Sequence, residues 1–301
     1  MQVYVIGATG FVGGGIAAHL VAAGHHVLGL ARTAEAAERL AARGVEPHRG
    51  DLDAGRAEVV ATAVAADAVV YAAQLPGPDE LALTAALLDG LAGTDRALLF
   101  TSGTGVLLQR TGGAWSPDSF AEDDPFDVEP LAAGRYAAER MVREDGRSRG
   151  VVVRPGQVWG PGDHGHVHAT YRSVAATGAA CYVGDGLATY THVHLADLAR
   201  LYDLVLTSAR GGAVYHAAAG EVPNRWIAEA VGADLGRPTR SLTLAEAVEV
   251  WGEMGALVLG SSSRSRDPRT RIELGWRPVH TDLLSTVGEP RLRALAAVPT
   301  P

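Results

Sequence analysis

The chain has 301 residues, of which 47% are hydrophobic, and its formal net charge at pH 7 is -8. This length and apolar content predict a globular protein with a sizeable core, built as one large domain or two smaller ones. The negative charge, without any long run of arginine, argues against a nucleic-acid partner, and no apolar run approaches the length of a membrane span.

Two residue counts restrict the chemistry further. The chain contains no lysine, so its 26 basic residues are all arginines, and any mechanism that needs a lysine is excluded. Cys181 is the only cysteine, which excludes an internal disulfide and a cysteine metal cage. Because the first predicted strand follows Met1 closely, we expect no signal peptide and a cytoplasmic protein.

The N-terminal segment predicts a dinucleotide-binding turn. Residues 3–6 have the apolar run of a buried strand, and a glycine-rich sequence leads from them into an alanine-rich helix. The GxxGxxG spacing lets the chain reverse tightly, bring its amides close to a pyrophosphate, and pack the helix against the strand. The residues expected to hold a cofactor here are Gly7, Thr9, Gly10, Phe11, Val12 and Gly13.

The end of the second predicted strand indicates which nicotinamide cofactor is bound. A chain selective for NAD places an acid there, which accepts a hydrogen bond from the ribose 2′-hydroxyl. This chain has Ala31 instead, followed by Arg32 and Thr33. Arg32 offers a planar fork for a 2′-phosphate and Thr33 a further donor, so the sequence favours NADP(H). The alternative is that Arg32 only precedes the next helix.

Strand-like and helix-like segments alternate through the first half of the chain. Strands are expected at residues 2–6, 26–30, 45–48, 68–72, 96–100 and 150–154. Their apolar runs and short connections predict an α/β fold of the Rossmann type, a doubly wound parallel sheet with helices on both faces.

This pattern also predicts the domain organisation. We expect the cofactor domain to span residues 1–160 and a smaller C-terminal substrate domain to span residues 161–301, with residues 187–220 returning to the core. The segment 109–130, rich in glycine, proline and acids, is too long for a plain connector, and we expect it to border a site and close over the substrate.

Five motifs in order connect the chain with a known superfamily. They are Gly7–Gly13, Gly50–Leu52, Arg154–Gly162, Val193–Ala199 and Leu274–Pro278. Together they resemble the extended short-chain dehydrogenases/reductases, and in particular the group called NAD-dependent epimerases/dehydratases, over nearly the whole chain.

The resemblance implies where a cofactor lies. Asp51 and Leu52 are expected to contact the adenine, although Asp51 has an alternative role as a helix N-cap. The other residues implied to line the cofactor follow the fourth, fifth and sixth strands: Ala72, Ala73, Gln74, Thr101, Ser102, Gly103, Pro155, Gly156 and Val158. Asp197 is expected to cap its helix and not to act as a catalyst.

The catalytic residues usual in this superfamily are missing, so its catalytic triad is degenerate here. Members that reduce carbonyls have a Ser or Thr after the fifth strand and a YxxxK pair on the next helix, where this chain has Gly103, Leu131 and Arg135. Arg135 can still bond a ribose as a cofactor clamp, but it holds no proton to exchange. A shifted register pairs Tyr136 with Arg140. Helix geometry, however, turns Tyr136 away from the helix face that Arg135 occupies, and the alternative role of Tyr136 is to pack against the sheet.

The proton donor therefore stays open. The candidates are Thr104, Tyr136, Tyr190 and two histidines of the loop after the sixth strand, His164 and His166. Histidine is chemically apt because its ordinary pKa lies near neutrality. The alternation of these histidines with His168 invites a metal ion, but no carboxylate or cysteine accompanies them at a ligand spacing, so we expect none.

Three hypotheses about function follow. The first is an NADP(H)-dependent oxidoreductase acting on a small carbonyl, imine or activated alkene. The second is a redox-neutral isomerase, epimerase or cyclase on the same fold, and the third is a non-catalytic NADP(H)-sensing protein that has lost the triad. We favour the first because the cofactor motifs remain intact. The expected partner is a small-molecule substrate, and a homodimer is left open.

Overall fold

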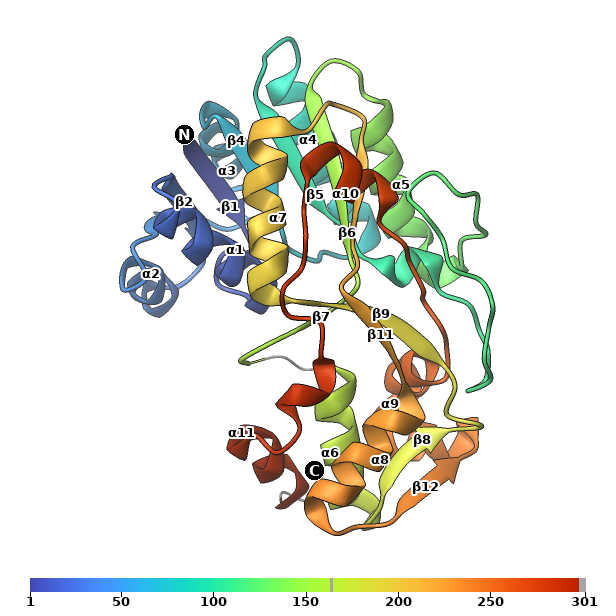
Figure 1. Ribbon diagram of the computed structural model, residues 1–301. Coiled ribbons are helices and arrows are strands. Elements are labelled where there is room, and N and C mark those ends of the chain that lie inside the picture. Colours follow the sequence, from blue (N-terminus) through green and yellow to red (C-terminus); the bar gives the residue numbers. More distant parts are fainter. Residues whose placement is uncertain (163–164, 298–301) are drawn as a thin grey trace.

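The computed structural model describes residues 1–162 and 165–297. Figure 1 shows a large sheet flanked by helices and, below it in that view, a smaller lobe of helices and short strands. The predicted domain boundary at residue 160 lies between the short strand β7 (Gln157–Trp159), which follows the large sheet in the chain, and the first helix of the smaller lobe, α6 (His166–Thr177).

The large sheet has seven strands, all of whose neighbouring pairs are parallel. They are β1 (Gln2–Ile6), β2 (His26–Ala31), β3 (Glu46–Arg49), β4 (Ala68–Tyr71), β5 (Ala97–Thr101), β6 (Arg149–Pro155) and β10 (Val214–Ala217). Their order across the sheet is β10-β6-β5-β4-β1-β2-β3. The predicted Rossmann-type doubly wound sheet is confirmed.

Helices cover both faces of this sheet because side chains of each strand alternate between them. Val3 and Val5 of β1 belong to one hydrophobic core, and Tyr4 and Ile6 belong to the other. The helices packed in the first core are α1 (Phe11–Ala22), α2 (Ala34–Ala41), α7 (Leu195–Ser208) and the end of α10 (Pro268–Leu274). The helices in the second core are α3 (Arg56–Ala65), α4 (Gly77–Leu91) and α5 (Ala133–Glu144).

The smaller lobe is built on short strands and later helices. One sheet contains β7, β9 (Thr189–His194) and β11 (Gly220–Pro223), and a parallel pair contains β8 (Ala180–Val183) and β12 (Thr239–Leu242). Its helices, after α6, are α8 (Asn224–Leu235), α9 (Leu244–Leu259) and α11 (Pro290–Arg293). Four 3-10 helices complete the described chain: η1 (Thr104–Leu107), η2 (Pro130–Ala132), η3 (Leu283–Thr286) and η4 (Ala294–Ala297).

The chain returns to the large sheet after it first enters the smaller lobe. α7 packs against α1, and β10 pairs with β6 at the edge of the sheet. A second return, which the sequence analysis did not anticipate, places α10 and Trp276 on the first core. Trp276 is 1% exposed, and its Nε1 donates to the Asp197 carbonyl at 2.9 Å.

Asp197 binds the backbone of the segment that follows Trp276 and is not the N-cap of α7, so its expected role as a helix cap is wrong. The side chain that caps α7 is that of His194, which accepts from the Ala196 amide. The buried Asp197 carboxylate instead accepts from the amides of Val279 and His280, at 3.0 and 2.7 Å. It therefore ties the segment after Trp276 to the start of α7.

A buried ion pair joins α5 to the sheet. Arg154 on β6 and Glu139 on α5 are both 0% exposed. The Arg154 Nε donates to the two Glu139 carboxylate oxygens at 3.0 and 2.9 Å, and a terminal nitrogen donates to Oε2 at 2.5 Å. The pair fixes α5 beside the ends of β5 and β6, where the site lies.

Removing one partner of this pair would leave an uncompensated buried charge. We predict that Glu139→Ala lowers the free energy of unfolding by about 3 to 5 kcal/mol, measured by urea denaturation. The matched control is Glu144→Ala, which breaks the exposed pair with Arg140 on the same helix and should change stability little. Equal effects of the two substitutions would show that the buried pair does not hold α5.

Candidate active site

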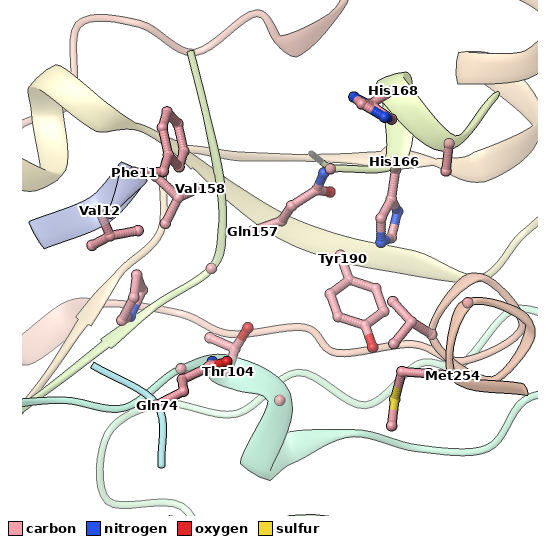
Figure 2. A pocket seen from close by; sticks show the side chains of 18 of the residues that line it. Phe11, Val12, Gln74, Thr104, Gln157, Val158, His166, His168, Tyr190 and Met254 are labelled. Carbon is pink, nitrogen blue, oxygen red and sulfur yellow. The ribbon is translucent and has the colours of Figure 1, made fainter. Parts of the chain in front are cut away.

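A cavity of about 1170 Å³ lies where the large sheet meets the smaller lobe. Its sheet side is formed by segments at the carboxyl ends of parallel strands: Gly7, Thr9–Gly13, Ala72–Gln74, Thr101–Gly105 and Pro155–Val158. Its other side comes from the smaller lobe: Gly165, His166, His168, Ala169, Arg172, Tyr190, Val248–Gly252, Met254, Gly255, Val258 and Leu259. Figure 2 shows side chains from both sides facing one space. This is the crevice where open α/β sheets bind ligands.

The glycine turn brings three backbone segments into close contact. Gly7 has a φ of 96°, and a Cβ added to it would stand 2.5 Å from the Ala72 carbonyl oxygen. A Cβ on Gly13 would stand 2.3 Å from the Gly7 carbonyl oxygen. A Cβ added to Gly10 would stand 3.4 Å from the Gly7 carbonyl oxygen, which is an ordinary contact, so that side of the turn has room. The first amides of α1, which have no partner inside the helix, therefore lie at the cavity and can bind an anion.

The segment after β5 contributes an unused donor. Ser102 lines the cavity, and its buried Oγ has no hydrogen-bond partner in the described part of the chain. Its neighbour Thr101 shares a hydrogen bond of 2.5 Å with the Tyr202 hydroxyl, which fixes this segment against α7. Gly103 also lines the cavity and adds no side chain.

Arg135 supports the cavity wall from behind. Its guanidinium donates to the carbonyls of Thr101 and Ala73, at 3.2 and 3.5 Å. It also pairs with the buried Glu80 at 3.1 Å and lies over the Phe100 ring. Arg135 is not among the residues that line the cavity in the described chain. Its direct contact with a ribose stays a prediction, whereas its bonds to two wall segments are present.

The other two residues considered for the usual tyrosine, Leu131 in η2 and Tyr136 in α5, lie away from the cavity. Tyr136 packs edge-on against Phe126, with ring centroids 5.4 Å apart, and Leu131 is 53% exposed. Neither lines the cavity in the described chain. Tyr136 would need a change of position to reach a ligand there, so we do not assign it the proton transfer.

A smaller cavity adjoins the glycine turn and is lined by the residues expected to lie near the adenine end of a cofactor. Arg32, Thr33, Asp51 and Leu52 line it, together with Arg39, which the sequence analysis missed. Arg39 lies on α2, which begins just after Thr33. Two arginines thus line this hollow together with the carboxylates of Asp51 and Asp53.

Two of these residues also have local roles. The Thr33 hydroxyl caps α2 by accepting from the Ala36 amide at 3.2 Å. Asp51 accepts from the Asp53 amide at 2.7 Å, whereas the N-cap position of α3 is Gly55. The alternative role of Asp51 as the N-cap of that helix is therefore wrong, and its contact with adenine stays a prediction.

The two loop histidines that the structure describes, His166 and His168, have different partners. His166 Nδ1 lies 2.8 Å from the side-chain amide oxygen of Asn224, and burial lowers the pKa of His166 to about 4. His168 Nε2 accepts from Arg172 Nε at 2.8 Å. His164 lies outside the described residues. Over residues 1–162 and 165–297, no group of His, Cys, Asp and Glu side chains is arranged to hold a metal ion.

The segment 109–130 does not line the large cavity in the described structure, and its closure over a substrate stays a prediction. The amide of Gln109 donates to the Ser262 carbonyl at 2.8 Å, and the Phe120 amide donates to the Arg264 carbonyl at 3.0 Å. These backbone bonds hold the segment against residues 261–266.

In the described chain no helix is long and apolar enough to cross a membrane.

Sequence reasoning missed the wall made by α9. Gly252 has a φ of 72° and interrupts the helix, so that successive residues such as Val250 and Trp251 face the cavity. The Trp251 Nε1 donates to the Ala169 carbonyl at 3.0 Å, which holds α9 against α6. An isolated glycine in a helical pattern was the available signal.

The chain belongs to the NAD dependent epimerase/dehydratase family, which it matches over residues 3–219. It is 32% identical to the uncharacterized protein C2A9.02 of Schizosaccharomyces pombe, over 95% of this chain and 97% of that protein. It is 30% identical to a dTDP-4-dehydro-6-deoxy-D-allose reductase of Streptomyces bikiniensis, over 79% of this chain and 82% of the reductase.

Solved structures have the same fold at lower identity. UDP-glucuronic acid 4-epimerase from Bacillus cereus, in complex with UDP-glucuronic acid and NAD, superposes with a TM-score of 0.76 at 17% identity, over 98% of this chain and 99% of that one. The human epimerase family protein SDR39U1, with NADPH, superposes with a TM-score of 0.70 at 24% identity, over 98% and 99%.

The contacts around the turn predict unequal effects of adding one methyl group. Gly13→Ala should lower the free energy of unfolding by about 1 to 3 kcal/mol, because the Cβ meets a backbone carbonyl that cannot move aside freely. Gly10→Ala should change stability little, because its Cβ has room. Chemical denaturation of both variants checks this, and a Gly13→Ala protein as stable as the wild type would contradict the packing described.

Proposed function

We propose that the protein is an NADP(H)-dependent oxidoreductase that acts on a small carbonyl, imine or activated alkene. The observation that carries the proposal is the continuity of one cavity from the amides of the glycine turn to a pocket beyond Ser102. A dinucleotide bound at the turn would extend along the strand ends, and its nicotinamide end would face the side chains of the smaller lobe.

The residues present fit such a cofactor. The open side of Gly10 leaves room for a pyrophosphate at the N-terminus of α1. The unpartnered Ser102 Oγ is suited to bond a cofactor or substrate group, since a buried hydroxyl without a partner is costly. When bound, reduced nicotinamide would supply the hydride. The chain's own part is to hold the acceptor carbon close by, to exclude water and to provide a proton.

The preference for NADP(H) is supported by the smaller cavity. Arg32 and Arg39 both line it, and Thr33 lies beside them. A ribose 2′-phosphate placed there would meet two planar guanidinium forks, whereas a 2′-hydroxyl would leave them unused. The related human protein SDR39U1 was solved with NADPH, although the Bacillus cereus epimerase was solved with NAD.

We predict that NADPH binds more tightly than NADH, because only NADPH carries the 2′-phosphate. Arg32→Ala and Arg39→Ala should each cost about 1.5 to 3 kcal/mol in NADPH binding and little in NADH binding, as measured by calorimetric titration. Arg210→Ala, which removes an exposed arginine that lines neither cavity, is the charge-matched control. Equal losses for both cofactors in the Arg32 and Arg39 variants would rule out the phosphate site.

The reaction itself is tested by following NADPH with a panel of small aldehydes and ketones. We expect the wild type to consume NADPH and form the alcohol in equal amounts. Gly10→Val should stay folded by circular dichroism but lose NADPH binding and turnover together, because its branched side chain fills the pyrophosphate position. NADPH binding without consumption would contradict the oxidoreductase and favour a redox-neutral enzyme or a cofactor-sensing protein.

A further inference from the structure

Tyr190 is a largely buried residue whose hydroxyl has no hydrogen-bond partner among the described residues. Tyr190 is the tyrosine that lines the large cavity, and it is 9% exposed. Among the described residues its hydroxyl forms no hydrogen bond. A phenol that lines a cavity and has no partner in the protein is free to donate to a molecule bound there. Its position therefore points to a ligand atom in the cavity.

The backbone around Tyr190 places it between the strand ends that form the sheet side of the cavity. The next residue, Thr191, lies against Gly156, where an added Cβ would stand 2.4 Å from the Thr191 carbonyl oxygen. Tyr190 itself forms a parallel bridge with Ser263, whose Oγ donates to the Thr104 carbonyl at 2.5 Å. Tyr190 is thus connected to both segments that flank the expected nicotinamide position.

His166 fixes the orientation of the Tyr190 ring. Their rings pack edge to face, with centroids 4.8 Å apart, and Figure 2 shows the Tyr190 hydroxyl at the end away from His166. Asn224 Nδ2 donates to the Leu259 carbonyl at 2.8 Å, so its amide oxygen faces His166 and accepts from Nδ1. Burial keeps this imidazole neutral, with a pKa of about 4, so His166 provides packing and no positive charge.

The wall opposite the sheet is mainly apolar. α9 contributes Val250, Met254 and Val258 beside Trp251. The charged side chains that line the cavity, within the described chain, are Arg172 and Glu249, which have opposite signs, and Arg172 already donates to His168. This wall favours an apolar group over a diphosphate, which would require several cations.

We propose that Tyr190 binds the carbonyl oxygen of an apolar aldehyde or ketone and protonates it, while α9 packs against the rest of the molecule. This inference rests on the proposed function, which supplies the hydride. When bound, reduced nicotinamide would supply the hydride that forms the new C–H bond at the carbonyl carbon, so that the carbonyl is reduced and the nicotinamide oxidised. As the C=O π bond breaks, its electron pair moves to the oxygen, which takes the phenol proton, and the phenolate regains a proton from solvent.

The properties of Tyr190 suit this role in a chain without lysine. Burial raises the pKa of Tyr190 above its ordinary value, so the phenol is protonated at neutral pH and can donate. Even a phenol with a raised pKa is more acidic than the alcohol formed, so proton transfer to the developing alkoxide is favourable. No neighbouring lysine is needed to keep the donor in its protonated form.

The test uses p-dimethylaminocinnamaldehyde, an apolar aldehyde whose absorption moves to longer wavelength when its carbonyl oxygen accepts a hydrogen bond. With the NADP⁺ complex of the wild type, where no reduction occurs, we expect this shift. In Tyr190→Phe the shift should be lost, and with NADPH the reduction rate should fall about 100-fold or more. The affinity for NADPH should not change. Tyr182→Phe, at a tyrosine packed under Arg225 outside the cavity, is the matched control and should behave as wild type.

A second variant tests the apolar wall. Met254 lines the cavity but is 55% exposed, so Met254→Asp should fold normally. It should weaken aldehyde binding more than about tenfold, because a carboxylate there must lose water when the aromatic group binds, while NADPH affinity stays unchanged. Unaltered aldehyde binding in this variant would show that the apolar group does not lie against α9.

The outcomes separate this inference from the proposed function. A Tyr190→Phe protein with the wild-type absorption shift and reduction rate would overturn the role of Tyr190 without contradicting the oxidoreductase. The same conclusion would follow if the shift and the rate were lost only in Tyr136→Phe or in Thr104→Val. A shift that depends on Tyr190 without any NADPH consumption would support Tyr190 as the carbonyl anchor and contradict the reduction. Failure of the wild type to bind the aldehyde would overturn the inference.

Discussion

The close approach of three backbone segments at Gly7, Gly13 and Ala72 is the constraint on which the site depends. A side chain on either glycine would meet a carbonyl group, so β1, the start of α1 and the end of β4 can converge only where Cβ atoms are absent. Their convergence leaves the first amides of α1 open toward the cavity. It also sets where the later segments must lie, because β5 and β6 continue the same parallel sheet and end beside the turn.

The chain has no lysine, and we propose that its proton donor lies on the lobe side of the cavity. Arg135, which the sequence alignment places where the family usually has a lysine, donates to two backbone carbonyls and pairs with Glu80. It therefore holds segments of the cavity wall together. The usual tyrosine position holds Leu131, which is exposed. Ser102 on the sheet side and Tyr190 on the lobe side are two of the polar side chains that line the cavity, and Thr104 and Gln157 are among the others. In the reaction proposed here the proton comes from Tyr190 on β9 and not from α5.

Much of the fold could be predicted because it depends on local pattern. The apolar runs of the strands and the glycine spacing near Gly7 identify the sheet and its cofactor edge without any long-range information. What could not be predicted depends on contacts between distant segments. Trp276 joins the first core only because Asp197 holds the following residues, and α9 reaches the cavity only because Gly252 breaks it and Trp251 bonds to α6. Tyr190 was one candidate among several in the sequence, and its ring contact with His166 and its place in the cavity wall depend on such distant contacts as well.

The central claim is that one cavity holds a dinucleotide at the glycine turn and presents its nicotinamide end to the smaller lobe. A crystal structure of the complex with NADP⁺ tests this most directly. The account predicts the 2′-phosphate between Arg32 and Arg39, the pyrophosphate at Gly10 and the nicotinamide ring between Gly103 and Pro155, on the side of Tyr190. A nicotinamide ring outside this cavity, or a 2′-phosphate that meets neither arginine, would contradict it.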